Sequence, residues 1–136
     1  MAIADLAYQH ALDQLAALGF AALPERERDL AALWHVESAV NNGGFLRYYS
    51  APAGDLAFHA PEALARLGAA QKAAIVRTAN ALFGTSGPPR DRKKRRAALA
   101  QLSAQALAAF GELEERYCQD PIDVDELVEN SIRRQT

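Results

Sequence analysis

Two asparagines followed by two glycines at positions 41–44 interrupt a segment whose composition otherwise suits a helix. Glycine adopts positive φ angles at little steric cost, so glycines commonly end helices. Phe45, Tyr48 and Tyr49 follow at once, although aromatic residues make up only 7% of the chain. We therefore expect one helix to stop at this Asn-Asn-Gly-Gly motif, and a short aromatic helix over residues 45–49 to follow it.

Apolar residues recur at helical spacing along most of the chain, and no segment shows the alternation of a strand. Glycine and proline separate the predicted helices, most clearly at residues 84–89. Pro61 divides the segment after the motif into two short pieces, and Ser103 and Asp123 stand where they can cap the last two helices. We predict an all-α fold, a single-domain bundle of about six to eight short helices, with residues 1–136 forming one helical domain.

The chain has enough apolar residues for a core, since half of them are hydrophobic. Trp34, Phe45 and Phe83 are the aromatic residues that we expect inside it. Tyr48 and Tyr49 are adjacent, so on a helix their side chains project about 100° apart. We therefore expect at least one of these tyrosines on the surface, where it would favour association into a homodimer.

Composition predicts a cytoplasmic protein. A single cysteine, Cys118, cannot form an internal disulfide and suits a reducing compartment. The first residues lack the basic start and apolar run of a signal peptide. No stretch reaches the roughly 18 apolar residues of a membrane span, so we expect no membrane association.

The sequence contains no pattern that predicts catalysis. His10, His35 and His59 fall on separate predicted segments, without a second ligand at metal-binding spacing. Phosphate-loop, dinucleotide-binding and nucleophile-elbow patterns are absent from it. We predict a protein that is not an enzyme and that has no catalytic residue, no metal site and no cofactor.

The motif is part of a longer pattern, Glu37-x3-Asn41-Asn42-Gly43-Gly44-Phe45-x-Arg47-Tyr48. This pattern resembles the signature of a DNA-mimic-protein-like family, a group of small bacterial helical domains. Segments 60–64, 81–84 and 113–117 resemble later parts of that family in the same order, so the resemblance covers residues 20–132. It implies a helical fold and a dimeric protein that imitates DNA and occupies the DNA-binding surface of a transcription factor.

The net charge of −2 conceals two segments of opposite sign. Residues 90–96 carry a net charge of +5, and residues 112–129 carry −7. The basic segment lies at the start of a predicted helix, where the helix dipole disfavours cations. Some other interaction must therefore offset this cost.

Three interpretations of the two segments stay open. The basic helix packs beside the acidic segment, so that their charges pair or form a solvated face. Alternatively, basic side chains bind phosphate or nucleic acid, and the candidates are Arg90, Arg92, Lys93, Arg95 and Arg96. In the third interpretation acidic side chains bind a basic protein, such as a regulator that normally binds DNA, and the candidates are Glu112, Glu114, Glu115, Asp123, Asp125, Glu126 and Glu129.

The role of Glu37 is open in a similar way. It shares a predicted apolar helix face with Leu30 and Leu33, where a charge needs hydrogen bonds. We expect its carboxylate to accept backbone N–H bonds from residues 42–45. The alternative is a polar pocket for a small ligand, lined by Glu37, Asn41, Asn42, Arg47 and Tyr48.

The sequence therefore predicts, first, a non-enzymatic protein-binding module whose acidic C-terminal third contacts a basic partner. Direct binding of nucleic acid or phosphate by the basic helix is the main alternative. A small-ligand site at the Asn-Asn-Gly-Gly motif is the third hypothesis.

Overall fold

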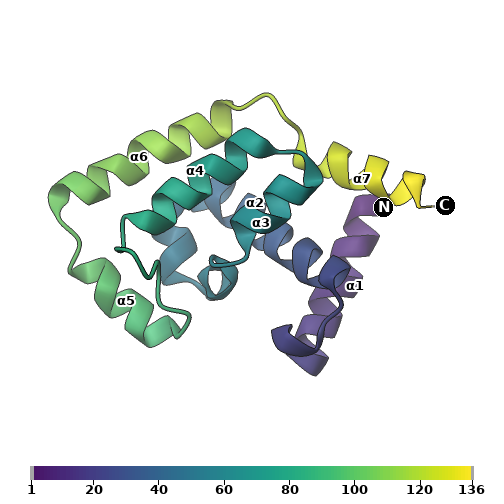
Figure 1. Cartoon of the computed structure of the whole chain (residues 1–136), viewed down its shortest axis with the longest axis horizontal. Helices are drawn as coiled ribbons and strands as arrows, with labels where there is room; N and C mark the ends of the chain where they lie inside the picture. The colour runs from purple at the N-terminus through teal and green to yellow at the C-terminus, as the bar shows by residue number, and fades with distance from the viewer. Residues whose placement is uncertain (1, 136) are drawn as a thin grey trace.

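Residues 2–135 are described by a computed structural model, and they form seven α-helices, two short 3-10 helices and no strand (Figure 1). The elements in chain order are α1 Ile3–Leu18, η1 Phe20–Ala22, α2 Glu25–Ser50, η2 Pro52–Leu56, α3 Ala60–Leu67, α4 Ala70–Ala81, α5 Arg92–Ala100, α6 Ala104–Gln119 and α7 Val124–Arg134. The predicted all-α bundle is confirmed, and the number of helices falls within the expected range.

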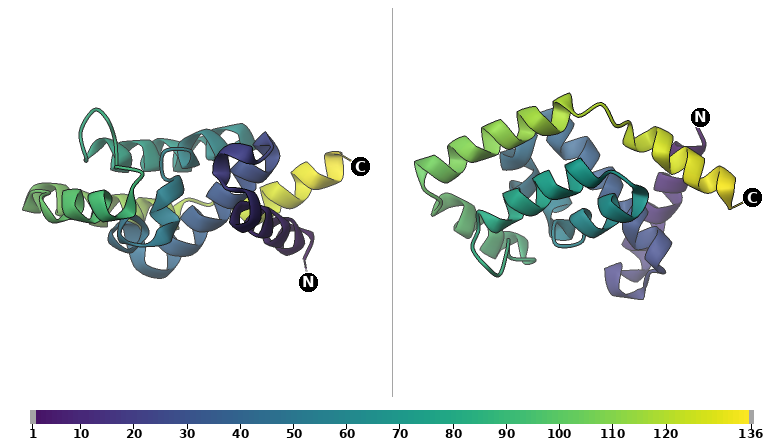
Figure 2. Two further views of the ribbon diagram at one scale, coloured as in Figure 1. Left: turned by 90° about the horizontal axis from the view of Figure 1, so that it is seen from below. Right: turned by 45° about the horizontal axis from the view of Figure 1, so that its top comes forward.

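Helix α2 is the centre of the bundle. It is the longest helix, with 26 residues, and α1, α3, α5, α6 and η2 all pack against it. Figures 1 and 2 show α6 running along one long edge of the molecule and α7 continuing that edge after a short link. Because α7 also packs on α1 and α3, the first and last helices lie at the same end of the bundle.

The Asn-Asn-Gly-Gly motif divides α2 into two helical segments that meet at a bend. Gly44 alone leaves the helical region, with φ 77° and ψ −172°, whereas Gly43 stays helical. Helical turns resume at once and continue to Ser50. The prediction that one helix ends at the motif and a short aromatic helix follows is therefore confirmed. Since the break is one residue long, the two helical segments are counted together as α2.

A distant carboxylate binds the backbone N–H that this break releases. A non-helical residue interrupts the ladder of backbone hydrogen bonds, so the N–H that follows it needs another acceptor. The N–H of Phe45 donates to Oε2 of Glu114, on α6, at 3.0 Å. This hydrogen bond ties α6 to the bend in α2.

The residues after the bend form an aromatic core. The Phe45 ring centroid lies 6.0–6.3 Å from those of Tyr48, Tyr49, Phe110 and Tyr117. Tyr48 and Tyr49 are both 0% exposed, so the prediction that one reaches the surface is wrong. Because α5 and α6 both pack against α2, side chains that project in different directions are both covered. Neither tyrosine is therefore available on the surface for the homodimer contact that we predicted from them.

The prediction that Trp34 lies in the core is also wrong, since its side chain is 38% exposed. Leu33 and Val36 occupy the buried face of α2 in its place. Phe45 is fully buried, as predicted, and Phe83 is partly buried against the core.

Local signals in the sequence locate several helix ends correctly. Ser103 and Asp123 each accept the N–H three residues further on, at 3.1 and 3.2 Å, and so cap α6 and α7. Pro61 lies in the first turn of α3, and η2 precedes it as the separate piece that we expected. Asp91 caps α5 in the same way at 2.9 Å, which we did not predict.

We predict that Gly44→Ala strongly destabilises the fold. A Cβ atom at this position would overlap the Glu114 carboxylate, and a positive φ costs a non-glycine residue about 1–2 kcal/mol. Displacement of the carboxylate would leave the Phe45 N–H unpaired, which adds about 1–3 kcal/mol. The free energy of unfolding, measured by urea denaturation, should therefore fall by about 2–5 kcal/mol.

Gly111→Ala is the matched control for this substitution. Gly111 lies inside α6 with open space where a Cβ would project, so alanine should raise the free energy of unfolding by about 0.5–1 kcal/mol. Similar losses for the two variants would contradict the role given to the bend.

Candidate functional site

The carboxylates of the C-terminal third lie along the edge that α6 and α7 form. Phe110 and Leu113 face the core from α6, and Glu112 and Glu115 follow them by two positions each. Two residues of a helix turn by about 200°, so the two glutamates lie on the opposite, solvent face. We define the acidic edge as the carboxylates outside the core packing, namely Glu112, Glu115, Asp120, Asp123, Asp125, Glu126 and Glu129.

Glu114 differs from the other predicted partner-binding residues. It is half-buried, and its carboxylate accepts the Phe45 N–H described above. Its place in the structure is therefore in the scaffold under the acidic edge.

Few cations of the chain itself neutralise the acidic edge. Among the ion pairs within residues 2–135, only Glu129 of this edge takes part, with Arg133 at 3.8 Å. Other members accept hydrogen bonds from neutral groups: Asp123 from the backbone of α7, and Asp125 from the Tyr8 hydroxyl at 3.0 Å. The edge therefore keeps its negative charge.

Arg95, from the basic segment, lies inside the protein. Its side chain is 0% exposed, and its guanidinium donates to the carbonyl oxygens of Tyr49 at 2.6 Å and Ala51 at 2.9 Å. It also donates to two carbonyls of the loop before α5, at 3.0 and 3.2 Å, and to Asp55 at 2.8 Å. Arg95 thus joins α5 to the end of α2 and to η2.

The other arginines of α5 also bind groups of the chain. Arg92 pairs with Asp55 at 2.8 Å, and Arg96 donates to the Ser50 carbonyl at 2.7 Å. Burial alone would raise the pKa of Asp55, but hydrogen bonds from Arg92 and Arg95 outweigh it, and the pKa is lowered. These contacts and the Asp91 cap offset the cost of placing cations at the start of a helix.

All the cations of the basic segment except Arg95 keep an exposed surface. Lys93 is exposed at the start of α5, and the exposed Arg90 guanidinium lies over the Phe58 ring, 3.6 Å from its centroid. No ion pair within residues 2–135 joins the segment 90–96 to the acidic edge. The part of the first interpretation in which the two charged segments pair with each other is therefore wrong, whereas the exposed cations of α5 fit its other part, a solvated face.

Glu37 does not have the hydrogen bonds that we predicted. Its Oε2 accepts from the Tyr117 hydroxyl and from Lys72 Nζ at 3.4 Å, whereas Glu114 accepts the Phe45 N–H. Burial, followed by the charge and hydrogen bond of Glu37, raises the pKa of Tyr117. Glu37 therefore does have a structural role, but it joins α2 to α4 and α6.

The predicted ligand pocket at the motif is only partly assembled. Tyr48 is fully buried, and Arg47 is exposed. A cavity of about 200 Å³ does bring the remaining motif residues of α2 together with α1 and α7, and it is lined by Tyr8, Trp34, Glu37, Ser38, Asn41, Asn42 and Asp125.

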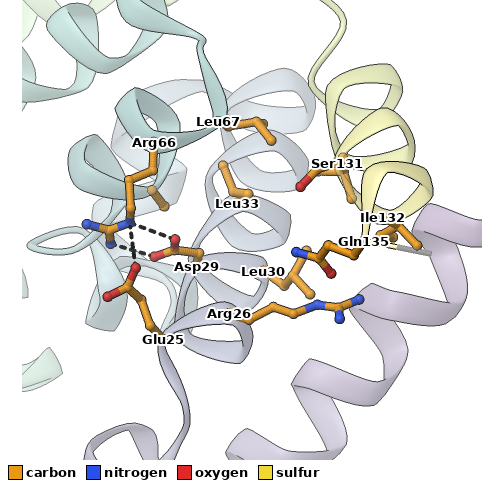
Figure 3. A pocket seen from close by; sticks show the side chains of 12 residues that line it. Glu25, Arg26, Asp29, Leu30, Leu33, Arg66, Leu67, Ser131, Ile132 and Gln135 are labelled. Carbon is orange, nitrogen blue, oxygen red and sulfur yellow. Dashed lines mark hydrogen bonds and ion pairs between the residues drawn. The ribbon is translucent and has the colours of Figure 1, made fainter.

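A second cavity, of about 240 Å³, lies between α2, α3 and α7 (Figure 3). Leu30, Leu33 and Leu67 line its apolar part. On one side of the cavity Arg66 donates to Asp29 at 2.7 and 2.8 Å. Burial alone would raise the pKa of Asp29, but the hydrogen bonds from Arg66 and from the neighbouring His59 outweigh it, so the pKa is lowered. The residues that the structure describes contain no cluster of His, Cys, Asp and Glu that could hold a metal ion.

A family model described as DMP19-like protein matches residues 21–135. The chain belongs to the DMP19-like family. Searches of curated proteins and of solved structures found no significant match. The family assignment confirms the resemblance drawn from the 37–48 pattern.

The DMP19-like match covers the bent helix α2 and the whole acidic edge, whereas α1 lies before it. No helix among residues 2–135 is both long enough and apolar enough to cross a membrane. The sequence reasoning missed Asp55 and Lys72, because no local pattern identifies an ionic partner that lies far away in the chain.

We predict that Arg95→Met costs much more stability than a change at its exposed neighbour. Removing one partner of a buried, hydrogen-bonded charge typically costs about 3–5 kcal/mol, and several carbonyls here would lose their donors. Lys93→Met is the control, and it should change the free energy of unfolding by less than about 0.5 kcal/mol. A small loss for Arg95→Met in urea denaturation would contradict its internal role.

Stability should also depend on pH through Asp29. Its lowered pKa means that folding favours the carboxylate, so the stabilisation is present above the ordinary value of 3.8 and is lost as the pH falls through the lower pKa of the folded state. Asp29→Asn should therefore cost about 1–3 kcal/mol at pH 6 and progressively less below pH 4. An equal difference at both ends of a urea-denaturation pH series would contradict this assignment.

Proposed function

We propose that this DMP19-like protein is a non-enzymatic regulator that binds a basic partner protein, of the kind that binds DNA, through its acidic edge. The observation that carries the proposal is the separation of charge. The basic segment is largely bound by carbonyls and by Asp55, while six of the seven carboxylates of the edge have no ion pair within the described chain.

The geometry of the edge supports an imitation of a phosphate backbone. Glu112 and Glu115 are three residues apart, so they present two carboxylates about one turn apart on the solvent face of α6. Helix α7 continues beyond the link (Figure 2), and it carries the exposed Asp125 and Glu126. A partner that binds phosphates would meet a series of carboxylates along α6 and α7.

The small net charge is compatible with this function. A surface potential depends on how charges are distributed, and a patch of one sign accelerates encounter with a patch of the other. Here the acidic edge and the basic start of α5 belong to different parts of the bundle (Figure 1). The charge distribution therefore also orients an approaching partner.

The proposal predicts which substitutions remove the partner. A variant with Glu112→Gln, Glu115→Gln and Glu126→Gln removes three exposed carboxylates that make no ion pair. It should weaken binding by about tenfold or more, since exposed interfacial charges each contribute about 0.5 kcal/mol. Binding is measured by pull-down from a lysate of the native host, with and without nuclease, and then by titration of the isolated partner.

Lys93→Gln together with Lys94→Gln is the matched control, because these exposed cations lie on α5. If the proposal is correct, the wild-type protein should recover a basic, DNA-binding protein both with and without nuclease treatment. The lysine variant should recover the same protein. Recovery of nucleic acid only without nuclease, with loss in the lysine variant, would overturn it in favour of nucleic-acid binding through α5.

A further inference from the structure

Trp34 is the only tryptophan in the chain, and it lies on the surface of α2. A tryptophan with more than a third of its surface exposed leaves a large apolar area in water, and such exposed aromatic groups are common where proteins bind partners. Leu33 and Val36 fill the buried side of the helix, whereas the Trp34 ring makes a T-shaped contact with the His35 ring, with centroids 5.2 Å apart, and keeps more than a third of its surface in water.

The exposed ring stands beside a polar cavity. Trp34, Glu37, Ser38 and Asn41 follow one another at helical spacing, so they form one stripe along α2. Helix α1 adds Tyr8 and α7 adds Asp125, and the cavity between them has a volume of about 200 Å³. We call this site the Trp34 pocket. Since Asp125 is also a member of the acidic edge, the pocket is continuous with it.

Each of the two carboxylates in the pocket has one oxygen bound and one without a partner. Glu37 is bound through Oε2, and Asp125 through Oδ1, which accepts from the Tyr8 hydroxyl at 3.0 Å. Within the described chain no hydrogen bond reaches Glu37 Oε1 or Asp125 Oδ2. Both carboxylates are held in place, and each keeps an acceptor.

One internal cation lies near the pocket and does not fill it. Lys72 is 5% exposed, and it approaches Glu37 Oε2 from the interior, over the Tyr117 ring at 4.5 Å from its centroid. With this lysine included, the Trp34 pocket still has a net negative charge. Its occupant should therefore be a cation that has a flat face for the indole.

We infer that the Trp34 pocket receives an arginine side chain of the basic partner, an inference that rests on the proposed function of the acidic edge. The guanidinium stacks on the exposed face of Trp34 and donates to Glu37 Oε1 and Asp125 Oδ2. Arginine fits better than lysine, because its planar fork provides several fixed N–H donors and stacks on aromatic rings. The acidic edge attracts the partner, and the pocket fixes its position.

The test uses hexa-arginine and hexa-lysine, which carry the same number of side-chain charges. Trp34 emission reports on the pocket alone, because the chain has no other tryptophan. Hexa-arginine should change that emission saturably and bind more tightly than hexa-lysine by about threefold to tenfold in calorimetry. Hexa-lysine should bind the edge with a smaller change of emission.

Three variants separate the pocket from the edge. Trp34→Ala should weaken hexa-arginine binding by about fivefold to tenfold with little effect on hexa-lysine, and Trp34→Phe, which keeps an aromatic face, should fall between this variant and the wild type. The double variant Glu112→Gln with Glu115→Gln should weaken the binding of both peptides to the same extent. The size of the Trp34 emission change at saturating hexa-arginine should stay the same. Thermal melting of each variant checks that the fold is kept.

The outcomes distinguish the two proposals. In one outcome both peptides bind, the edge variant weakens their binding, and neither Trp34 emission nor the Trp34 variants distinguish the two peptides. This outcome overturns the pocket inference and leaves the acidic edge supported. If the Trp34 variants weaken hexa-arginine and the edge variant has no effect, the pocket stands and the proposed edge fails. If neither hexa-arginine nor hexa-lysine binds, both the pocket inference and the proposed acidic edge are overturned.

Discussion

The hydrogen bond between Glu114 and the Phe45 N–H is the interaction on which the arrangement of the bundle depends. A helix as long as α2 would otherwise carry its last turns straight past the core. The extended Gly44 redirects them, and the Glu114 carboxylate accepts a hydrogen bond from the Phe45 N–H at the break. Helix α6 is thereby fixed beside the bend, with its opposite face turned to solvent. One face of α6 thus packs on the scaffold, and its opposite face carries Glu112 and Glu115 of the acidic edge.

A second ionic centre plays the corresponding role for the basic helix. Arg95 is an internal donor for carbonyls at the end of α2 and in the loop before α5, and Asp55 balances its charge. The basic segment resembles a nucleic-acid-binding patch in sequence, yet it contains Arg95, which joins α5 to the end of α2 and to η2. In a small helical domain rich in alanine, such bonds provide geometric specificity that apolar packing alone supplies weakly.

The sequence predicted those features that depend on local chemistry. Caps by Ser103 and Asp123, the two pieces around Pro61 and the all-α class follow from side chains within a few residues of the feature they control. Glu114, Arg95 and Lys72 act on groups far away in the chain, so one sequence could not assign them. Trp34 was misplaced because hydrophobicity identifies a helix face only approximately, and the long α2 has neighbours on several sides. Of the candidate site, the acidic segment could be read from composition, whereas the Trp34 pocket required three helices to be placed together.

The contribution of α1 to that pocket has a consequence for how the family can diversify. Tyr8 holds Asp125 by its hydroxyl, yet α1 lies before the part of the chain that the family shares. The shared region carries the acidic edge, and α1 adds one wall of the Trp34 pocket. Helix α1 also buries Ala4, Tyr8 and Ala11 in the core, so relatives that differ in this helix would have to keep these core positions while they vary the rest of it.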